Sequence, residues 1–411
     1  MAARTSAVGR AEPRPGAPRP TGGDSRIAVV GAGIAGLTLA LALGRAGNRC
    51  EVYEQAGQLR ELGAGVQIAP NAARLLRRLG LGRRLDAMAV RAQAVEMRRW
   101  DDSRLLSRSE LGAACEARYG APYYLVHRAD LHRALLSEVE ADQLHLGSRC
   151  VRVEEYDDGV RLHFADGSAH EADVVVGADG IRSVVREALA TDRPRFSGQS
   201  MYRGLVPAEE LPFLLDEPKV RLWFGPGQHC VCYPVAAGKW ISVGATAPAG
   251  DRAPESWTAE GRTTELLRIY RGWHEEVGRV LGALRAVGRW ALHDRDPLPR
   301  WCGGRIVVAG DSAHPMLPFM AQGANQAIED AVVLAGCLAG AGPRDVQAAL
   351  ARYERLRKPR TDRIQRMSRA NARTFHLGDG KRQHERDLSL DRRRHNDQEW
   401  LYGYDAGVLD E

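Results

Sequence analysis

The chain has 411 residues, of which 44% are hydrophobic and 27% are charged. This is the composition of a globular protein with a sizeable core, and the length suits two or three domains of about 150 residues. No apolar run approaches the roughly 18 residues that cross a membrane, and residues 1–24 lack the apolar centre of a secretory signal. We therefore expect a cytoplasmic protein with no membrane partner, and we interpret residues 1–24 as a disordered tail.

The cysteines and the charged residues argue against two other kinds of site. Seven cysteines are scattered along the chain, and the closest pair, Cys230 and Cys232, cannot complete a zinc site with two thiols. The net charge of +6 comes mostly from arginine, and the densest basic stretch, residues 352–394, is interleaved with acids. That pattern is typical of a solvated helix face. We expect neither a metal site nor nucleic-acid binding.

The first elements predict a strand, a helix and a second strand. Residues 26–30 are a short β-branched run, which favours a buried parallel strand. Residues 37–47 are rich in Leu and Ala and predict a helix, and residues 49–54 predict the second strand. Together they form one β-α-β unit.

The turn of this unit carries the pattern G-x-G-x-x-G. Gly31 allows a tight turn, Gly33 lets a pyrophosphate approach the backbone, and Gly36 lets helix and strand pack closely. Glu54 ends the second strand, where its carboxylate can accept hydrogen bonds from a ribose diol. The unit predicts a dinucleotide site, and the acid favours FAD or NAD over NADP because it would repel a 2′-phosphate.

Three further segments place a glycine or an acid directly after a strand or before a helix. They are residues 173–183, which include Asp179 and Gly180; residues 305–315, which include Gly310 and Asp311; and residues 318–330, which include Gly323, Ala324 and Asn325. Taken singly, Asp311 could be a helix cap and Gly323 ordinary turn chemistry.

In this order and spacing, the segments resemble the single-component FAD-dependent aromatic hydroxylases of the p-hydroxybenzoate hydroxylase-like class. The resemblance covers about residues 25–370. Within the class, five shorter motifs resemble the salicylate, 3-hydroxybenzoate and 6-hydroxynicotinate hydroxylase branch: residues 63–71, 126–131, 202–204, 272–274 and 400–404. The resemblance implies an enzyme that holds FAD, takes hydride from NADH or NADPH as a transient co-substrate, and hydroxylates a small aromatic substrate with O2 through a C4a-hydroperoxyflavin.

The resemblance also implies roles for residues around the flavin. Asp311 would bind the ribityl chain or a ribose, and Arg128 would lie near the pyrophosphate or the ribityl chain. Asp179 belongs to the motif that the family links to both FAD and NAD(P)H. Gly323, Ala324 and Asn325 would open a helix whose N-terminus faces the N1/C2=O edge of the flavin, where its dipole stabilises the reduced anion.

Residues 196–290 predict a second, mostly antiparallel sheet that lies over the flavin. Four short strands, at 201–206, 220–224, 229–234 and 240–245, are separated by turn residues, and residues 94–100 are expected to join them. One helix, 264–284, is expected to cover the outer face.

His229 and Tyr233 are the predicted catalytic residues. They lie four apart on one strand, so their side chains share a face. In the resembling branch, a His and a Tyr at this spacing contact the substrate phenol, and a neutral His can draw off the phenol proton. The alternative is a pair satisfied by hydrogen bonds inside the sheet.

The predicted substrate pocket contains both polar and apolar residues. Gln67 belongs to the 63–71 motif, and Arg203 or Arg221 could bind a substrate carboxylate. Pro318 and Phe319 stand where the family often has Gln or His, so the pocket is more apolar here and closer to the 6-hydroxynicotinate pattern. Phe319 could stack on an aromatic ring.

The sequence thus predicts an α/β fold, with a Rossmann-type FAD-binding domain, an inserted antiparallel substrate domain and a C-terminal helical segment. The expected FAD-binding domain is discontinuous and consists of residues 25–93, 118–190 and 291–345. The expected substrate domain consists of residues 94–117 and 191–290, and the helical segment of residues 346–411. The sequence leaves open the substrate, the hydroxylated position, decarboxylation, NADH against NADPH and a homodimer. Two alternatives remain. The protein could be an enzyme that hydroxylates or epoxidises a larger natural-product scaffold, or a regulator that binds flavin without turnover.

Overall fold

The computed structural model describes residues 25–59, 64–249, 261–392 and 398–408, so the predicted disordered tail lies outside the described residues. A six-stranded sheet in the order β18-β19-β12-β1-β2-β8 builds one half of the molecule, and only β18 and β19 pair antiparallel. All residues of β1, β12 and β19 are buried, as expected of short Val- and Ile-rich parallel strands covered on both faces. The strands are β1 (Ile27–Val30), β2 (Cys50–Glu54), β8 (Leu144–Leu146), β12 (Val174–Gly177), β18 (Cys302–Gly303) and β19 (Ile306–Val308).

Helices pack against this sheet and against one another. The first helix, α1 (Ile34–Arg45), packs against α9 (Gly323–Leu338), and α9 packs against the long α10 (Val346–Phe375). The other helices of this half are α2 (Pro70–Leu76), α3 (Gly82–Met88), α4 (Gly112–Tyr119), α5 (Arg128–Leu136) and α6 (Val184–Glu187). Two small sheets complete it, β11-β10-β9 and β3-β7-β4, whose strands are β3 (Gly65–Ile68), β4 (Val90–Arg91), β7 (Tyr124–His127), β9 (Cys150–Tyr156), β10 (Gly159–Phe164) and β11 (Ala169–Ala172).

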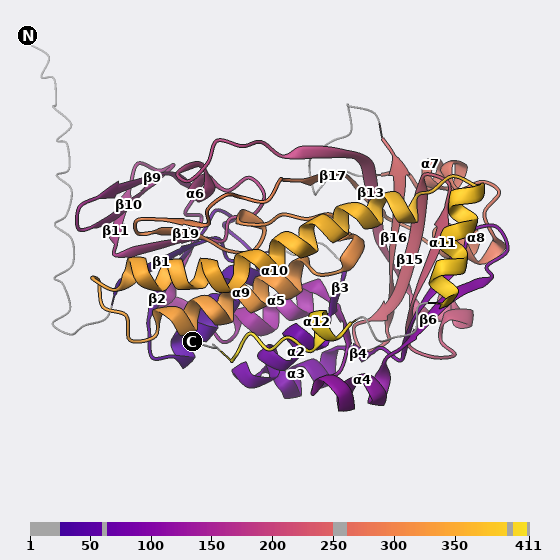
Figure 1. Cartoon of the computed structure of the whole chain (residues 1–411), viewed down its shortest axis with the longest axis horizontal. Coiled ribbons are helices and arrows are strands. Elements are labelled where there is room, and N and C mark those ends of the chain that lie inside the picture. Colours follow the sequence, from indigo (N-terminus) through magenta and orange to yellow (C-terminus); the bar gives the residue numbers. More distant parts are fainter. Residues whose placement is uncertain (1–24, 60–63, 250–260, 393–397, 409–411) are drawn as a thin grey trace, which may run out of the picture.

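A seven-stranded sheet, in the order β17-β13-β16-β15-β14-β5-β6, builds the other half (Figure 1). Neighbouring strands are antiparallel except β5 and β14, so the prediction that residues 94–100 join a mostly antiparallel sheet is confirmed. The strands are β5 (Ala94–Arg99), β6 (Leu105–Glu110), β13 (Arg195–Pro207), β14 (Lys219–Gly225), β15 (Gln228–Val235), β16 (Trp240–Pro248) and β17 (Gly288–Asp294).

Two helices, rather than the predicted single one, pack on the outer face of this sheet. They are α7 (Thr263–Ile269) and α8 (Glu275–Gly282). The prediction of one helix over 264–284 was wrong because the chain turns between them at Gly272, whose φ of +87° belongs to the left-handed region that a helix cannot contain. Their apolar side chains pack on Cys230 and Cys232, so the two thiols lie in a hydrophobic cluster.

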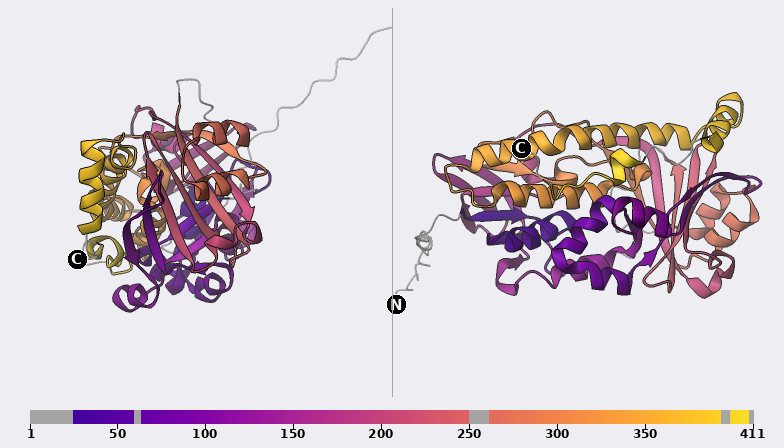
Figure 2. Two further views of the ribbon diagram at one scale, coloured as in Figure 1. Left: turned by 90° about the vertical axis from the view of Figure 1, so that its right-hand side faces the viewer. Right: turned by 60° about the horizontal axis from the view of Figure 1, so that its bottom comes forward.

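The C-terminal part of the chain connects the two halves. The helix α10 runs along the molecule from the six-stranded sheet to the seven-stranded one (Figures 1 and 2). At its end, α11 (Lys381–Arg392) contacts β6, and the short α12 (Glu399–Tyr402) returns to α2. The predicted C-terminal helical segment is therefore in contact with both halves.

Candidate functional site

The first β-α turn forms a cradle that side chains would fill. Gly31 has a φ of +105°, and a Cβ there would lie 2.4 Å from the carbonyl oxygen of Ala178. A Cβ on Gly36 would lie 1.9 Å from the carbonyl oxygen of Gly31, whereas one on Gly33 would meet no atom within 4 Å. No side chain caps the N-terminus of α1. The turn therefore presents backbone N–H groups and open space at a helix N-terminus, which is the arrangement that binds a pyrophosphate.

Glu54 stands beside this turn, as predicted. Its carboxylate accepts hydrogen bonds from the backbone N–H groups of Ala32, at 2.9 Å, and Ala56, at 2.8 Å. Each oxygen keeps lone-pair capacity for a further hydroxyl donor. The side chain is thus fixed at the edge of the cradle where a ribose is expected.

Asp179 joins the two later motifs of the six-stranded sheet. One carboxylate oxygen accepts from the Ser312 hydroxyl at 3.0 Å, and the other accepts from the Val184 N–H at 2.8 Å. Burial raises the pKa of this carboxyl. Asp179 therefore holds the loop after β12 against the loop after β19.

Asp311 is accessible to solvent, yet the surrounding protein raises its pKa by desolvation, and His314 and Arg128 lie close enough to oppose that rise. No described group hydrogen-bonds its carboxylate, and no side chain caps the adjoining short helix or α9. Asp311 is therefore not a helix cap, which was the alternative expected from the sequence. A solvent-accessible carboxylate near Arg128 is left for hydroxyl donors of a ligand.

The N-terminus of α9 is a further part of the predicted cofactor site. The helix begins at Gly323, as predicted, and Asn325 fastens it to β3: its Oδ1 accepts from the Ala69 N–H at 2.8 Å, and its Nδ2 donates to the Gln67 carbonyl at 3.0 Å. The residues present fit FAD. They provide a cradle without side chains, two helix N-termini without side-chain caps, and two acids that are predicted to accept hydrogen bonds from a ribose or the ribityl chain.

The predicted catalytic pair lies on the inner face of the seven-stranded sheet. In antiparallel strands, directly paired residues share a face. On β15, His229, Val231 and Tyr233 share one face, and Val231 pairs with Gly244, which pairs with Arg203 on β13. The structure therefore brings Arg203 onto the face of His229 and Tyr233. The Arg203 side chain lies over Gly244, since a Cβ on this glycine would be 3.9 Å from Arg203 Nε.

Arg203 is a half-buried cation with no carboxylate partner among the described residues. Burial lowers its pKa, the nearby Tyr233 opposes that change, and the charge of Arg128 adds to it. Its guanidinium lies 5.8 Å from the centre of the Trp290 ring. A cation in this state favours an anionic ligand, because a carboxylate would replace the lost hydration.

Arg221 does not belong to this face. It pairs with Cys232, which points to the outer side of the sheet, and its guanidinium donates to Asp216 at 2.8 Å and to the Phe213 carbonyl at 3.0 Å. Of the two arginines expected from sequence to bind a carboxylate, the structure therefore leaves only Arg203.

Tyr233 is packed against β3. A Cβ on Gly65 would lie 2.7 Å from the Tyr233 hydroxyl, so only glycine fits there. Burial raises the pKa of Tyr233, while Arg203, Ser242 and Gln67 oppose that rise. Gln67 itself accepts from the Tyr123 hydroxyl at 2.7 Å. Tyr233 thus stays protonated at neutral pH and is held by a polar network.

His229 has a partner that sequence reasoning missed. Its Nδ1 lies 2.8 Å from Nε2 of His376, and the Thr246 hydroxyl lies 3.1 Å from the former and 3.3 Å from the latter. His376 follows directly after α10, 147 residues away in sequence, and no local pattern marks it. Phe319 is buried beside the pair, with its ring centre 5.3 Å from that of His229. Pro318 begins the short helical turn Pro318–Met320 that carries Phe319.

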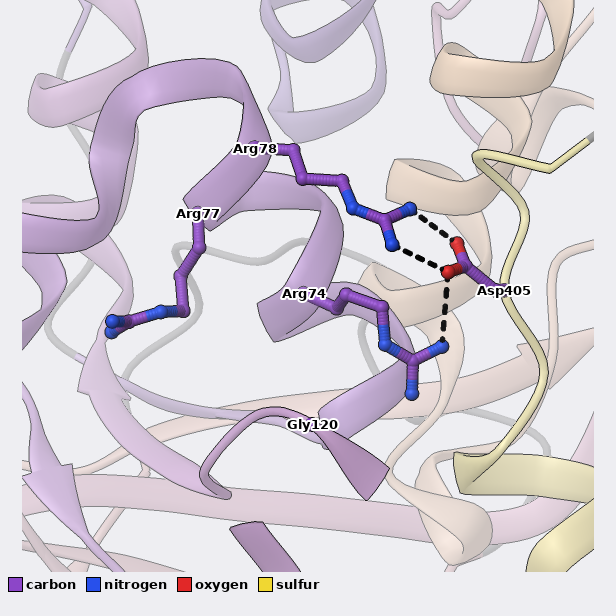
Figure 3. A pocket seen from close by; sticks show the side chains of 5 residues that line it. All are labelled: Arg74, Arg77, Arg78, Gly120 and Asp405. Atoms are coloured by element: carbon purple, nitrogen blue, oxygen red, sulfur yellow. Dashed lines mark hydrogen bonds and ion pairs between the residues drawn. The ribbon is translucent and has the colours of Figure 1, made fainter. Parts of the chain in front are cut away.

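One surface cavity lies apart from these groups. A surface cavity of about 410 Å³ is lined by Arg74, Arg77, Arg78, Gly120 and Asp405 (Figure 3). Its arginines are already paired with protein acids and carbonyls.

Within the described ranges, no group of three or more His, Cys, Asp and Glu residues could hold a metal ion, and no helix is long and apolar enough to cross a membrane.

Comparisons with known proteins agree with this geometry. Residues 24–368 match the model of a family described as FAD binding domain. A 3-amino-4-hydroxybenzoate 2-monooxygenase of Streptomyces platensis is 50% identical over 385 residues, which are 93% of this chain and 97% of that protein. A 6-hydroxynicotinate 3-monooxygenase of Bordetella bronchiseptica is 38% identical and covers 85% of this chain and 92% of its own. A salicylate hydroxylase solved with its substrate has a TM-score of 0.80 at 29% identity and covers 95% and 99% of the two chains.

Proposed function

The chain belongs to the FAD-binding-domain family of flavin-dependent aromatic monooxygenases, and from that membership we propose that its substrate is 3-amino-4-hydroxybenzoate or a closely similar aminophenolic acid. The observation that carries the proposal is the 50% identity to a 3-amino-4-hydroxybenzoate 2-monooxygenase along 97% of that protein, against 38% for the 6-hydroxynicotinate enzyme.

The proposed reaction inserts one oxygen atom at ring carbon 2. Aromatic C–H, O2, NAD(P)H and a proton give aromatic C–OH, water and NAD(P)+. Bound FAD supplies hydride acceptance from NAD(P)H and activation of O2. We propose that it is held by residues in and around the turns described above: Gly31, Gly33, Gly36, Glu54, Arg128, Asp179, Asp311, Gly323, Ala324 and Asn325.

The inner face of the seven-stranded sheet suits such a substrate. We propose that Arg203 binds the carboxylate, because it is a half-buried cation on the inner face without a described acidic partner. Phe319 and Pro318 offer apolar contacts to the ring, and Gln67 orients Tyr233. No described carboxylate lies at His229, and burial keeps the pKa of this imidazole well below its usual value, so it is neutral and can accept a proton.

The position of attack assigns His229 a specific partner on the substrate. Carbon 2 of 3-amino-4-hydroxybenzoate is adjacent to the carbon that carries the amino group and meta to the hydroxyl. The amine lone pair therefore activates carbon 2, and ionising the hydroxyl does not do so directly. We propose that His229 accepts an amine N–H proton as oxygen is transferred, rather than the phenol proton expected from the sequence alone.

A substrate panel tests the proposal. The purified holoenzyme is mixed with NADH or NADPH and with 3-amino-4-hydroxybenzoate, 6-hydroxynicotinate, 3-hydroxybenzoate or salicylate, and both cofactor oxidation and product mass are followed. We expect the aminohydroxybenzoate to give the largest kcat/KM and a product heavier by one oxygen. A larger kcat/KM for another acid, with no product from the aminohydroxybenzoate, would refute the assignment.

A further inference from the structure

His376 lies beyond residues 24–368, the part of the chain that the family model matches, yet it contacts the predicted catalytic histidine. The C-terminal half of α10 brings it there. Asn371 donates to the Phe319 carbonyl at 3.0 Å, and Gln365 donates to the Pro315 carbonyl at 3.0 Å. The helix is thus fastened to the segment that carries Phe319, and His376 follows at its end.

The two imidazoles share one hydrogen bond. The distance of 2.8 Å between His229 Nδ1 and His376 Nε2 allows a single proton between them, and the two ring planes are only 20° apart, as an N–H···N bond in the plane of both rings requires. The Thr246 hydroxyl bridges both nitrogens. No described group hydrogen-bonds Nε2 of His229, so that atom remains for a ligand.

The surroundings disfavour a charge on His229. The ring is 4% exposed, and burial together with the neighbouring His376 lowers its pKa. The hydroxyl of Tyr270 donates to the backbone carbonyl of His229 at 2.6 Å. His376 is half-buried, and burial lowers its pKa to about 4. A proton accepted by His229 therefore has to move on, and His376 lies on the side that solvent reaches.

We propose that His376 is a positioning residue for His229: it fixes which ring nitrogen of His229 carries the proton, and it accepts the proton that His229 Nδ1 gives up when Nε2 receives a proton from the bound aromatic amine. This inference rests on the proposed function, in which His229 faces the amino group of the substrate.

The proton transfer balances without a further reactant. The amine N–H bond breaks and its proton goes to Nε2 of His229, while the electron pair stays with the nitrogen. The proton on His229 Nδ1 passes to Nε2 of His376, and the proton on His376 Nδ1 leaves to water. Both rings end neutral, each with its proton on the other nitrogen, and the reverse sequence resets them.

Two variants of His376 and one control test this role. His376→Phe keeps an aromatic ring beside His229 and Phe319 but cannot carry a proton. His376→Ala opens space at a half-buried site that added imidazole can reach. His384→Phe is the control, because His384 is exposed on α11 and makes no described contact with His229. Flavin content and melting temperature are checked for each.

The holoenzyme variants are compared for hydroxylated product formed per NADH oxidised and for its pH profile. We expect His376→Phe to keep the substrate KM within about twofold and to lose product yield about tenfold or more, and imidazole to restore the yield of His376→Ala. Unchanged yield and pH profile in His376→Phe, or a loss in His376→Ala that imidazole leaves in place, would overturn the proposal.

A substrate-free measurement separates this inference from the proposed function. NMR of the histidine ring nitrogens in the holoenzyme reports which nitrogen of His229 is protonated. We expect that signal to change in His376→Phe and to stay in His384→Phe, and no change in either would overturn the pairing. If the wild-type enzyme hydroxylates a different acid of the panel, the proposed function fails, and the same variants are assayed with that acid.

Discussion

At the scale of single residues, two glycines of one helix differ in whether the fold has room for a side chain. Gly36 and Gly44 both lie in α1, but a Cβ on Gly36 would meet the Gly31 carbonyl at 1.9 Å, and a Cβ on Gly44 would meet nothing within 4 Å. We predict that Gly36→Ala purifies with at least about tenfold less bound FAD, because the cradle must shift. Gly44→Ala should keep its flavin and melt at the same or a higher temperature. Visible absorbance and thermal melting measure both, and an equally yellow Gly36→Ala would show that the cradle is not needed.

Arg203 and Arg221 form a second matched pair. Replacing Arg203 with Gln removes the unpaired cation of the inner face, and we predict that the Kd of the aromatic acid rises about 10- to 100-fold, the value of a charge-assisted hydrogen bond. Replacing Arg221 with Gln breaks the ion pair with Asp216 on the outer face, so the melting temperature should fall while the Kd stays the same. Flavin fluorescence titration gives the Kd. Equal Kd values for Arg203→Gln and the wild type would remove the carboxylate role.

At the scale of elements, the C-terminal segment 399–407 is bound across α2. Arg74 donates to the Tyr402 carbonyl at 3.1 Å and to the Tyr404 carbonyl at 3.2 Å, and Arg78 forms a two-bond ion pair with Asp405 (Figure 3). Tyr402 is half-buried and packs edge-on against Tyr123. Because Tyr123 donates to Gln67, the segment supports the residues that hold Tyr233, which gives a physical role to the 400–404 motif.

This docking predicts the effect of one arginine in α2. Arg74→Ala removes donors to three backbone carbonyls of the segment, so we expect unfolding to become easier by about 2 kcal/mol, together with a higher substrate KM. Arg83→Ala is the control, since Arg83 is exposed in the neighbouring α3 and should change neither quantity. Chemical denaturation and steady-state kinetics measure the two effects. A lower stability with an unchanged KM would disconnect the segment from the pocket.

At the scale of the whole molecule, a buried ionic cluster joins α9 to α10. Burial alone would raise the pKa of Glu329 and Asp330, but Arg357 and Arg360 outweigh it for Glu329, and His314 and Arg357 outweigh it for Asp330, so both values are lowered. A carboxyl whose pKa is lowered on folding stabilises the fold above its ordinary pKa, and this stability is lost as pH falls. We predict a steep fall in melting temperature below about pH 4.5. A flat profile down to about pH 3 would contradict the pairing.

How far the sequence predicts the molecule depends on how local each signal is. The glycine turn, Glu54 and the start of α9 at Gly323 follow from short motifs, and the alternation on β15 places His229 and Tyr233 on one face. Arg203 and Arg221 could not be separated by sequence, because the face of each depends on pairing with β16 and β15. His376 was missed because only the length and path of α10 bring it to His229. The break at Gly272 was missed because helical periodicity resumes directly after it.

We propose that this flavin-dependent monooxygenase hydroxylates 3-amino-4-hydroxybenzoate next to its amino group. The most direct test is to run the holoenzyme with NADH and that acid under isotopically heavy O2, and to determine the mass and the substitution pattern of the product. We expect one heavy oxygen in the product, at carbon 2. Oxidation of NADH that yields only hydrogen peroxide, or a heavy oxygen at carbon 5, would contradict it.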